Sequence, residues 1–161
     1  MWGWWGREKT MMMPTEPSAD HNAQDAHHPR RSKPLIAIVE DDRPLATTYQ
    51  QVLEQEGGWQ TLIVCDGEEA LRQLPQTRPD LILLDYNLPG LDGATLYRLL
   101  RARPPTALTP ILIVTASPDW VLRRAGLEPR EYLHKPFDLD DLLAAIESLL
   151  VHPPAHPPAV E

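Results

Sequence analysis

The chain has 161 residues, a formal net charge of -8 and one cysteine. This length suits a single domain whose core is large enough to fold unaided, and the lone Cys65 excludes a disulfide framework. Between Pro34 and His152 there are 18 acidic and 10 basic side chains, which argues against a nucleic-acid partner because such binding usually draws on a basic face. There is no signal-peptide pattern and no apolar run near the roughly 18 residues of a membrane helix, so we expect a cytoplasmic protein with no membrane partner.

The two ends of the chain lack the patterns of a folded domain. Residues 1–33 contain tryptophans, histidines and prolines without helical or strand periodicity, and we predict a disordered leader there. Residues 152–161 are rich in proline and are predicted to be a disordered tail. The domain is therefore expected at residues 34–151. Translation could instead begin within Met11–Met13, a question that the intact mass of the native protein would decide.

From residue 35 onward, apolar runs alternate with segments that have helical features. The runs predict five strands, at Leu35–Val39, 59–65, Leu81–Leu84, Ile111–Val114 and Tyr132–His134. Helices are predicted between them, at 42–56, 67–74, 93–102 and 118–126, with a last one from Asp138. Five repeats of strand and helix predict an α/β fold, namely a doubly wound five-stranded parallel sheet with helices on both faces.

Several residues mark where these helices begin and end. Asp42 and Asp92 are predicted as helix caps, and Pro44 suits the first turn of its helix. Pro75 and Pro79 are expected to frame a loop before the third strand. The last helix should bury one face, which consists of Leu139, Leu142, Leu143, Ile146, Leu149 and Leu150.

Polar residues follow four of the predicted strands. The buried strand Leu81–Leu84 ends on Asp85, Glu40 and Asp41 follow the first strand, and Thr115 and Lys135 follow the fourth and fifth. The carboxyl ends of parallel strands share one edge of the sheet, and ligands of open α/β sheets bind at that edge. We therefore expect these side chains to converge on one site.

Three converging carboxylates require a positive charge between them. At about 4 Å and an effective dielectric constant of about 20, each pair would repel by roughly 4 kcal/mol. Lys135 offsets part of this repulsion, and Mg²⁺ suits a set of oxygen ligands better than zinc does. Asp85 would then be a competent nucleophile toward phosphorus, with Thr115 and Lys135 holding the phosphoryl oxygens.

Four segments, in order, resemble the receiver domain of two-component response regulators. They read Ile-Val-Glu-Asp-Asp at 38–42, Leu-Leu-Asp-Tyr-Asn-Leu-Pro-Gly-Leu-Asp-Gly at 83–93, Val-Thr-Ala at 114–116 and Tyr-Leu-His-Lys-Pro-Phe at 132–137. The resemblance extends from Pro34 to about Val151 and implies a flavodoxin-like sheet with the strand order 2-1-3-4-5.

The resemblance also implies roles for the residues at the strand ends. Asp85 would accept a phosphoryl group from a phosphohistidine of a sensor histidine kinase or of a phosphotransfer protein, and Lys135 would contact that group. Asp41 would bind Mg²⁺ directly, Glu40 through water, and Asn87 through its main-chain carbonyl.

Thr115 and Tyr132 resemble the switch pair of the family, in which the hydroxyl moves toward the phosphate and the ring turns inward. The bond between Lys135 and Pro136 is expected to be cis, since cis costs little before proline. His134 should face outward from an edge strand. The segment from Thr115 to Lys135 is shorter than usual for the family, which predicts a short or displaced fourth helix.

The expected function is that of a stand-alone receiver, which signals by protein contact and promotes only its own phosphorylation and dephosphorylation. The resemblance allows for a dimer that forms on phosphorylation. The main alternative is a pseudo-receiver, a protein-interaction module that is not phosphorylated. A haloacid-dehalogenase-like phosphatase needs a second aspartate where this chain has Asn87, which argues against that enzyme.

Overall fold

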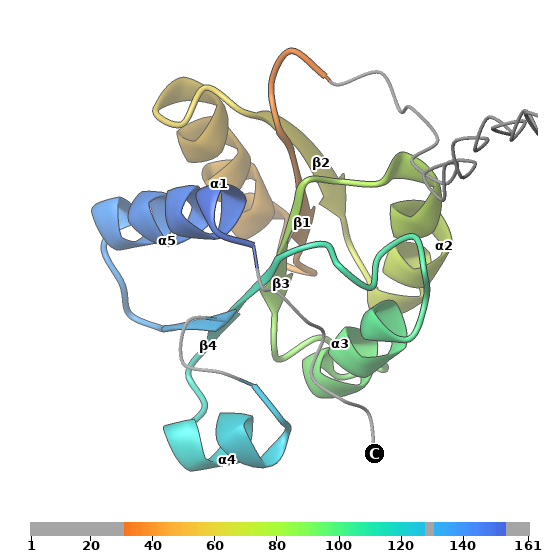
Figure 1. Ribbon diagram of the computed structural model, residues 1–161. Helices are drawn as coiled ribbons and strands as arrows, with labels where there is room; N and C mark the ends of the chain where they lie inside the picture. The colour runs from red at the N-terminus through yellow and green to blue at the C-terminus, as the bar shows by residue number, and fades with distance from the viewer. Residues whose placement is uncertain (1–30, 128–130, 154–161) are drawn as a thin grey trace, which may run out of the picture. The chain divides into compact units, whose positions relative to one another are not determined.

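The computed structural model describes residues 31–127 and 131–153, and within them five parallel strands form one sheet (Figure 1). The strands are β1 (Leu35–Val39), β2 (Gln60–Val64), β3 (Leu81–Asp85), β4 (Ile111–Thr115) and β5 (Tyr132–His134). The helices are α1 (Arg43–Gln55), α2 (Gly67–Thr77), α3 (Gly93–Arg101), α4 (Asp119–Arg124) and α5 (Leu139–Val151). The strand order is β2-β1-β3-β4-β5, which confirms the predicted fold class and order.

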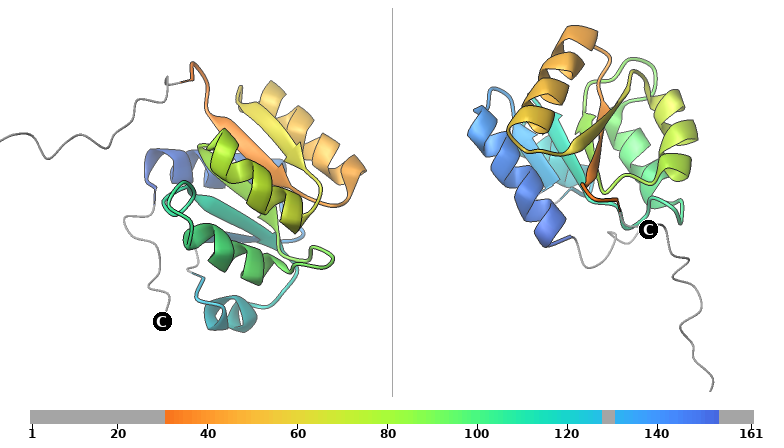
Figure 2. Two further views of the ribbon diagram at one scale, coloured as in Figure 1. Left: turned by 90° about the vertical axis from the view of Figure 1, so that its right-hand side faces the viewer. Right: turned by 90° about the horizontal axis from the view of Figure 1, so that it is seen from above.

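Helices cover both faces of the sheet. α1 and α5 lie on one face and α2 and α3 on the other (Figure 2). Successive residues of a strand point to opposite faces, so Ile36 and Ile38 pack beneath α1 and α5, whereas Ala37 and Val39 pack beneath α2 and α3. This double burial explains why the central strands are apolar throughout rather than alternating. None of the described helices is long and apolar enough to cross a membrane.

Aspartate side chains begin the helices that follow β1 and β3, as predicted. Asp42 Oδ1 accepts the N–H of Leu45 at 3.1 Å, and Asp92 Oδ1 accepts the N–H of Thr95 at 3.0 Å. These bonds satisfy N–H groups that the first helical turn leaves without a partner. Both aspartates are therefore helix caps.

The predicted end of α2 is wrong. The helix does not stop before Pro75 but continues through it to Thr77. A proline cannot donate to the carbonyl four residues earlier, which here belongs to Leu71. Arg103 Nη1 donates to that carbonyl instead, so a side chain from the loop after α3 replaces the missing backbone bond.

Other predictions for the helices have mixed outcomes. α4 has six residues, which confirms that it is short; Pro129, which follows its predicted end, lies outside the described residues. In α5, Leu142, Ile146 and Leu149 are buried, but Leu139 is 48% exposed, because it lies at the first position of the helix. The leader (1–33) and the tail (152–161) lie mostly outside the described residues, so the division of the chain remains a prediction.

One glycine shapes the loop that leaves β3. A Cβ on Gly93 would lie 2.6 Å from Tyr86 Cα and 2.7 Å from Tyr86 O. The N–H of Gly93 donates to that carbonyl at 3.0 Å. The absence of a side chain thus lets the start of α3 pack directly on the residue that follows Asp85.

Candidate functional site

Three carboxylates meet where β1 and β3 end. Val39 pairs with Leu84 in the sheet, so Glu40 and Asp85 are the next residues on neighbouring strands. One oxygen from each of Glu40, Asp41 and Asp85 lies within 4.8 Å of the other two. Glu40 is 2% exposed, Asp85 is 7% exposed and Asp41 is exposed, so the cluster has two buried members and one that faces solvent.

Both oxygens of Asp85 have partners. Lys135 Nζ donates to Oδ2 at 3.0 Å, and the N–H of Asn87 donates to Oδ1 at 2.9 Å. Lys135 comes from the loop after β5, whereas Asn87 comes from the loop after β3. The carboxylate is therefore oriented from two directions, and a cation lies directly beside it.

Glu40 is buried in a way that disfavours its charged form. Its Oε1 accepts the N–H of Asp42 at 3.1 Å, and its buried Oε2 has no hydrogen-bond partner among the described residues. Burial is the main cause that raises the pKa of Glu40 to about 7, and the negative charge of Asp85 adds to it. A divalent cation would compensate this buried oxygen, so the residues present fit a Mg²⁺ ion.

The predicted switch residues lie on the next two strands of the sheet, Thr115 at the end of β4 and Tyr132 at the start of β5. Thr115 is fully buried, its Oγ1 accepts the N–H of Ser117 at 2.9 Å, and its carbonyl accepts the N–H of Lys135 at 2.7 Å. The Tyr132 ring is 8% exposed, and its hydroxyl has no hydrogen-bond partner among the described residues. A backbone hydrogen bond thus connects Thr115 directly to Lys135, the residue that contacts Asp85.

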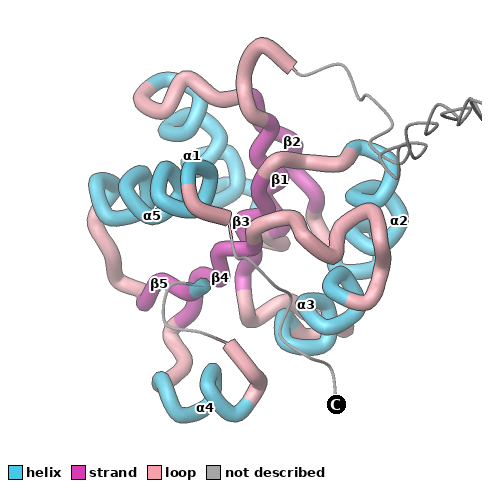
Figure 3. The backbone as a smooth tube through the Cα atoms, viewed as in Figure 1, coloured by secondary structure: helices cyan, strands magenta, loops and turns pink. Residues whose placement is uncertain are grey.

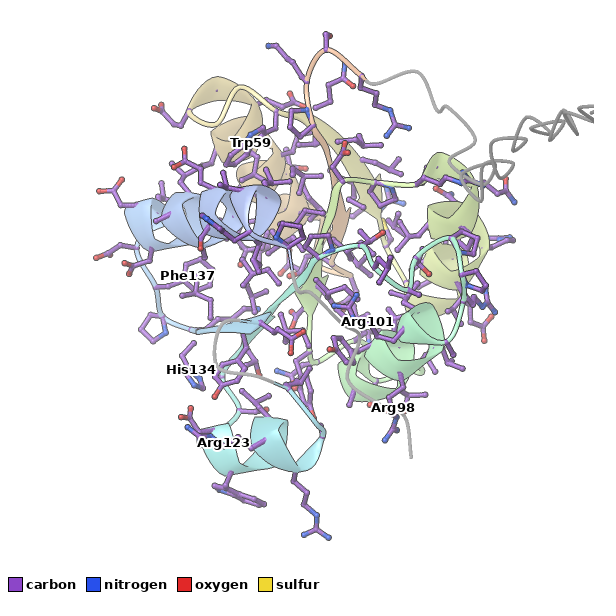
Figure 4. All side chains as sticks on the ribbon, in the orientation of Figure 1. Trp59, Arg98, Arg101, Arg123, His134 and Phe137 are labelled. Carbon is purple, nitrogen blue, oxygen red and sulfur yellow. The ribbon has the colours of Figure 1, made fainter. Side chains whose placement is uncertain are left out.

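The surroundings of β5 agree with the sequence in two respects. The Lys135–Pro136 peptide bond is cis, as expected. His134 is exposed and its Nε2 lies 2.5 Å from Asp119 Oδ1 at the start of α4, so its outward orientation is confirmed (Figure 4).

Tyr49 is a neighbour of the site that the sequence did not reveal as one. It lies on the buried face of α1 and is only 5% exposed. Burial, together with the charges of Glu40 and Asp85, raises the pKa of Tyr49 to about 12. Its ring stacks on Phe137, with 6.3 Å between the centroids.

The chain is similar to known proteins over most of its length. The family described as the response regulator receiver domain matches residues 36–147. The phosphate regulon transcriptional regulatory protein PhoB of Rhizobium meliloti is 38% identical over 119 residues, which are 73% of this chain and 52% of that protein. The DNA-binding response regulator MtrA of Mycobacterium leprae is 39% identical over 117 residues, 71% of this chain and 50% of that protein. The chain thus spans about half the length of the curated relatives it matches.

Solved structures show the same fold. The receiver domain of the sensor histidine kinase PA1611 from Pseudomonas aeruginosa PAO1, with a magnesium ion coordinated in its active site cleft, has a TM-score of 0.65 and 31% identity. The match covers 74% of this chain and 99% of that one. The receiver domain of the Francisella response regulator 1452 has a TM-score of 0.64 and 30% identity, with coverage of 73% and 97%.

Proposed function

Because the chain belongs to the response regulator receiver family of two-component systems, we propose that Asp85 accepts a phosphoryl group in the presence of Mg²⁺. The observation that carries this proposal is the pairing of Asp85 with Lys135 at 3.0 Å inside a cluster of three carboxylates. Such a cluster attracts a divalent cation, and the lysine provides a second positive charge for an incoming phosphate.

The chemistry follows from the oxygens of Asp85. One oxygen attacks phosphorus, the bond from phosphorus to the imidazole nitrogen of a phosphohistidine breaks, and the electron pair stays on that nitrogen. The N–H of Asn87 keeps the carboxylate oriented, while Lys135 Nζ turns from Asp85 to the transferred group. In this proposal the domain promotes only its own phosphorylation and dephosphorylation.

Mg²⁺ would be held by Asp41 directly, by Glu40 through water, by Asp85, and by the main-chain carbonyl of Asn87. When bound, it supplies positive charge that screens the phosphate from the carboxylates. The unpaired Glu40 Oε2 supports this assignment.

Thr115 and Tyr132 would report the phosphorylation state. The Thr115 hydroxyl is held by the N–H of Ser117 at 2.9 Å and would leave it for a phosphoryl oxygen. That movement would change the space beside the Tyr132 ring, whose hydroxyl has no competing hydrogen bond among the described residues. The site would then be read through α4 and β5.

The partners are proposed from the family and from charge. A sensor histidine kinase or a phosphotransfer protein would supply the phosphoryl group in the cytoplasm, and the domain at 34–151 would signal by protein contact, with a dimer as one form of that contact. The 18 acidic and 10 basic side chains between residues 34 and 152 favour a protein rather than nucleic acid as the partner of this domain.

Incubation with acetyl phosphate and Mg²⁺, followed by intact mass measurement, tests this function. The wild type should gain one phosphoryl group, and Asp85→Asn should gain none. Asp92→Asn is the matched control, because Asp92 is an exposed cap on the next helix and its loss should leave labelling intact. Absence of labelling in the wild type would favour the pseudo-receiver, a protein-interaction module that is not phosphorylated.

A further inference from the structure

Two aromatic rings connect α1 to the loop between β5 and α5. The rings of Tyr49 and Phe137 are stacked, with 6.3 Å between their centroids and 21° between their planes. Tyr49 is 5% exposed and belongs to the core cluster beneath α1 and α5, and Phe137 is partly buried against the same cluster. Figure 3 shows the loop that carries Phe137, and Figure 4 labels the side chain beside α5.

This loop begins at the lysine of the site. The N–H of Lys135 donates to Thr115 O at 2.7 Å, and its Nζ donates to Asp85 Oδ2 at 3.0 Å. Pro136, which follows, is exposed and has no N–H to donate. The ring of Phe137 is therefore the next attachment of the loop to the body of the domain.

The other ring belongs to the helix that begins at the acidic cluster. Asp42 caps α1, and its N–H donates to Glu40 Oε1 at 3.1 Å. Tyr49 follows two turns later on the buried face of the same helix. Its stack with Phe137 thus links the segment that carries Glu40 and Asp41 to the segment that carries Lys135.

We infer that Tyr49 and Phe137 are positioning residues, whose stacked rings hold Lys135 Nζ against Asp85 and thereby set the rate at which Asp85 is phosphorylated. This inference rests on the proposed function. A long lysine side chain loses much rotamer freedom when its ammonium is fixed, so a rigid loop reduces the cost of bringing Nζ to the site. Displacement by about 1 Å is enough to slow a reaction that depends on such positioning.

The experiment measures the rate of phosphorylation by acetyl phosphate with saturating Mg²⁺, a small donor that needs no protein docking. Tyr49→Leu keeps apolar bulk but removes the ring, and it should slow phosphorylation by about tenfold. Tyr49→Phe keeps the ring and should restore the rate. Leu74→Ala, in α2 on the opposite face of the sheet, should lower the melting temperature at least as much without slowing phosphorylation.

A double-mutant cycle separates positioning from packing. If Tyr49 acts through Lys135, then Tyr49→Leu should cause no further decrease in a Lys135→Ala background, where a slower residual reaction remains. An equal tenfold loss in both backgrounds, or an unchanged rate in Tyr49→Leu alone, would overturn the inference while leaving Asp85 as the acceptor. A wild type that takes up no phosphoryl group would overturn the proposed function, and the inference with it.

Discussion

Replacement of Asp85 by asparagine should make the domain more stable when Mg²⁺ is absent. The substitution removes one charge from the cluster of three carboxylates but keeps the shape of the side chain. Its amide oxygen can still accept the N–H of Asn87, which now donates to Oδ1 at 2.9 Å. The change in stability therefore reports mainly on charge.

The magnitude follows from the distances in the site. At an effective dielectric constant of about 20, Asp85 gains about 5.5 kcal/mol from Lys135 at 3.0 Å. It loses at least about 3.5 kcal/mol to Glu40, because the two carboxylate oxygens lie within 4.8 Å of each other. The exposed Asp41 is largely screened and adds about 1 kcal/mol of repulsion. These pair energies nearly cancel, so the desolvation of a carboxylate that is 7% exposed, several kcal/mol in magnitude, decides the sign. We expect the free energy of unfolding to rise by about 2 kcal/mol.

Urea denaturation at pH 8, with EDTA and with saturating Mg²⁺, measures this effect. At pH 8 Glu40 is ionised, because its pKa is about 7. Mg²⁺ at a hundred times its dissociation constant should stabilise the wild type by about 2.7 kcal/mol and the Asp85→Asn variant by less. A wild type that is more stable than Asp85→Asn in EDTA would refute this account of the charges.

Three further predictions concern Lys135, Glu40 and the buried ion pair of Arg101 with Glu131. Lys135→Ala should retain slow phosphoryl uptake from acetyl phosphate but lose the response of the Tyr132 ring, because Nζ no longer joins Asp85 to the loop after β5. NMR of the Tyr132 ring measures this response, and a normal response in the variant would contradict the role of Lys135. Without Mg²⁺, the contribution of Glu40 to stability should be present below about pH 4.5 and lost as the pH rises through about 7, since burial raises the folded pKa of Glu40 above its unfolded value. In urea denaturation, the free energy of unfolding of Glu40→Gln should not show this decrease with pH. Arg101→Met should lower the free energy of unfolding by about 3–5 kcal/mol in the same assay, because the buried Glu131, 3.6 Å from Arg101, loses its cation. A decrease below about 1 kcal/mol would show that this ion pair contributes little to stability.

The sequence predicts most of the framework of the site because that framework is local. Asp85 follows a run of buried apolar residues, and the carboxyl ends of parallel strands all lie at the same edge of the sheet. The same reasoning brings Glu40 and Lys135 to that edge, where the structure places them. Asp42 is likewise identified as a cap from its place before Pro44.

Contacts between distant segments could not be predicted in this way. A proline within a helix is usually a boundary, and only the side chain of Arg103, which donates to Leu71 O, allows α2 to continue past Pro75. The sequence gives no indication that Arg101 is 5% exposed, because an arginine in a helix usually faces solvent. Tyr49 matches the pattern of a core residue, and its stacking on Phe137 depends on how the loop after β5 returns toward α1.

The most direct test of the central claim is to locate the phosphoryl group on the chain. After treatment with acetyl phosphate and Mg²⁺, borohydride reduction converts an aspartyl phosphate into a stable residue that mass spectrometry of peptides can identify. Modification at Asp85, in the peptide that contains β3 and Asn87, is the predicted result. Modification at Asp41 or at another acid, with Asp85 unchanged, would contradict the account.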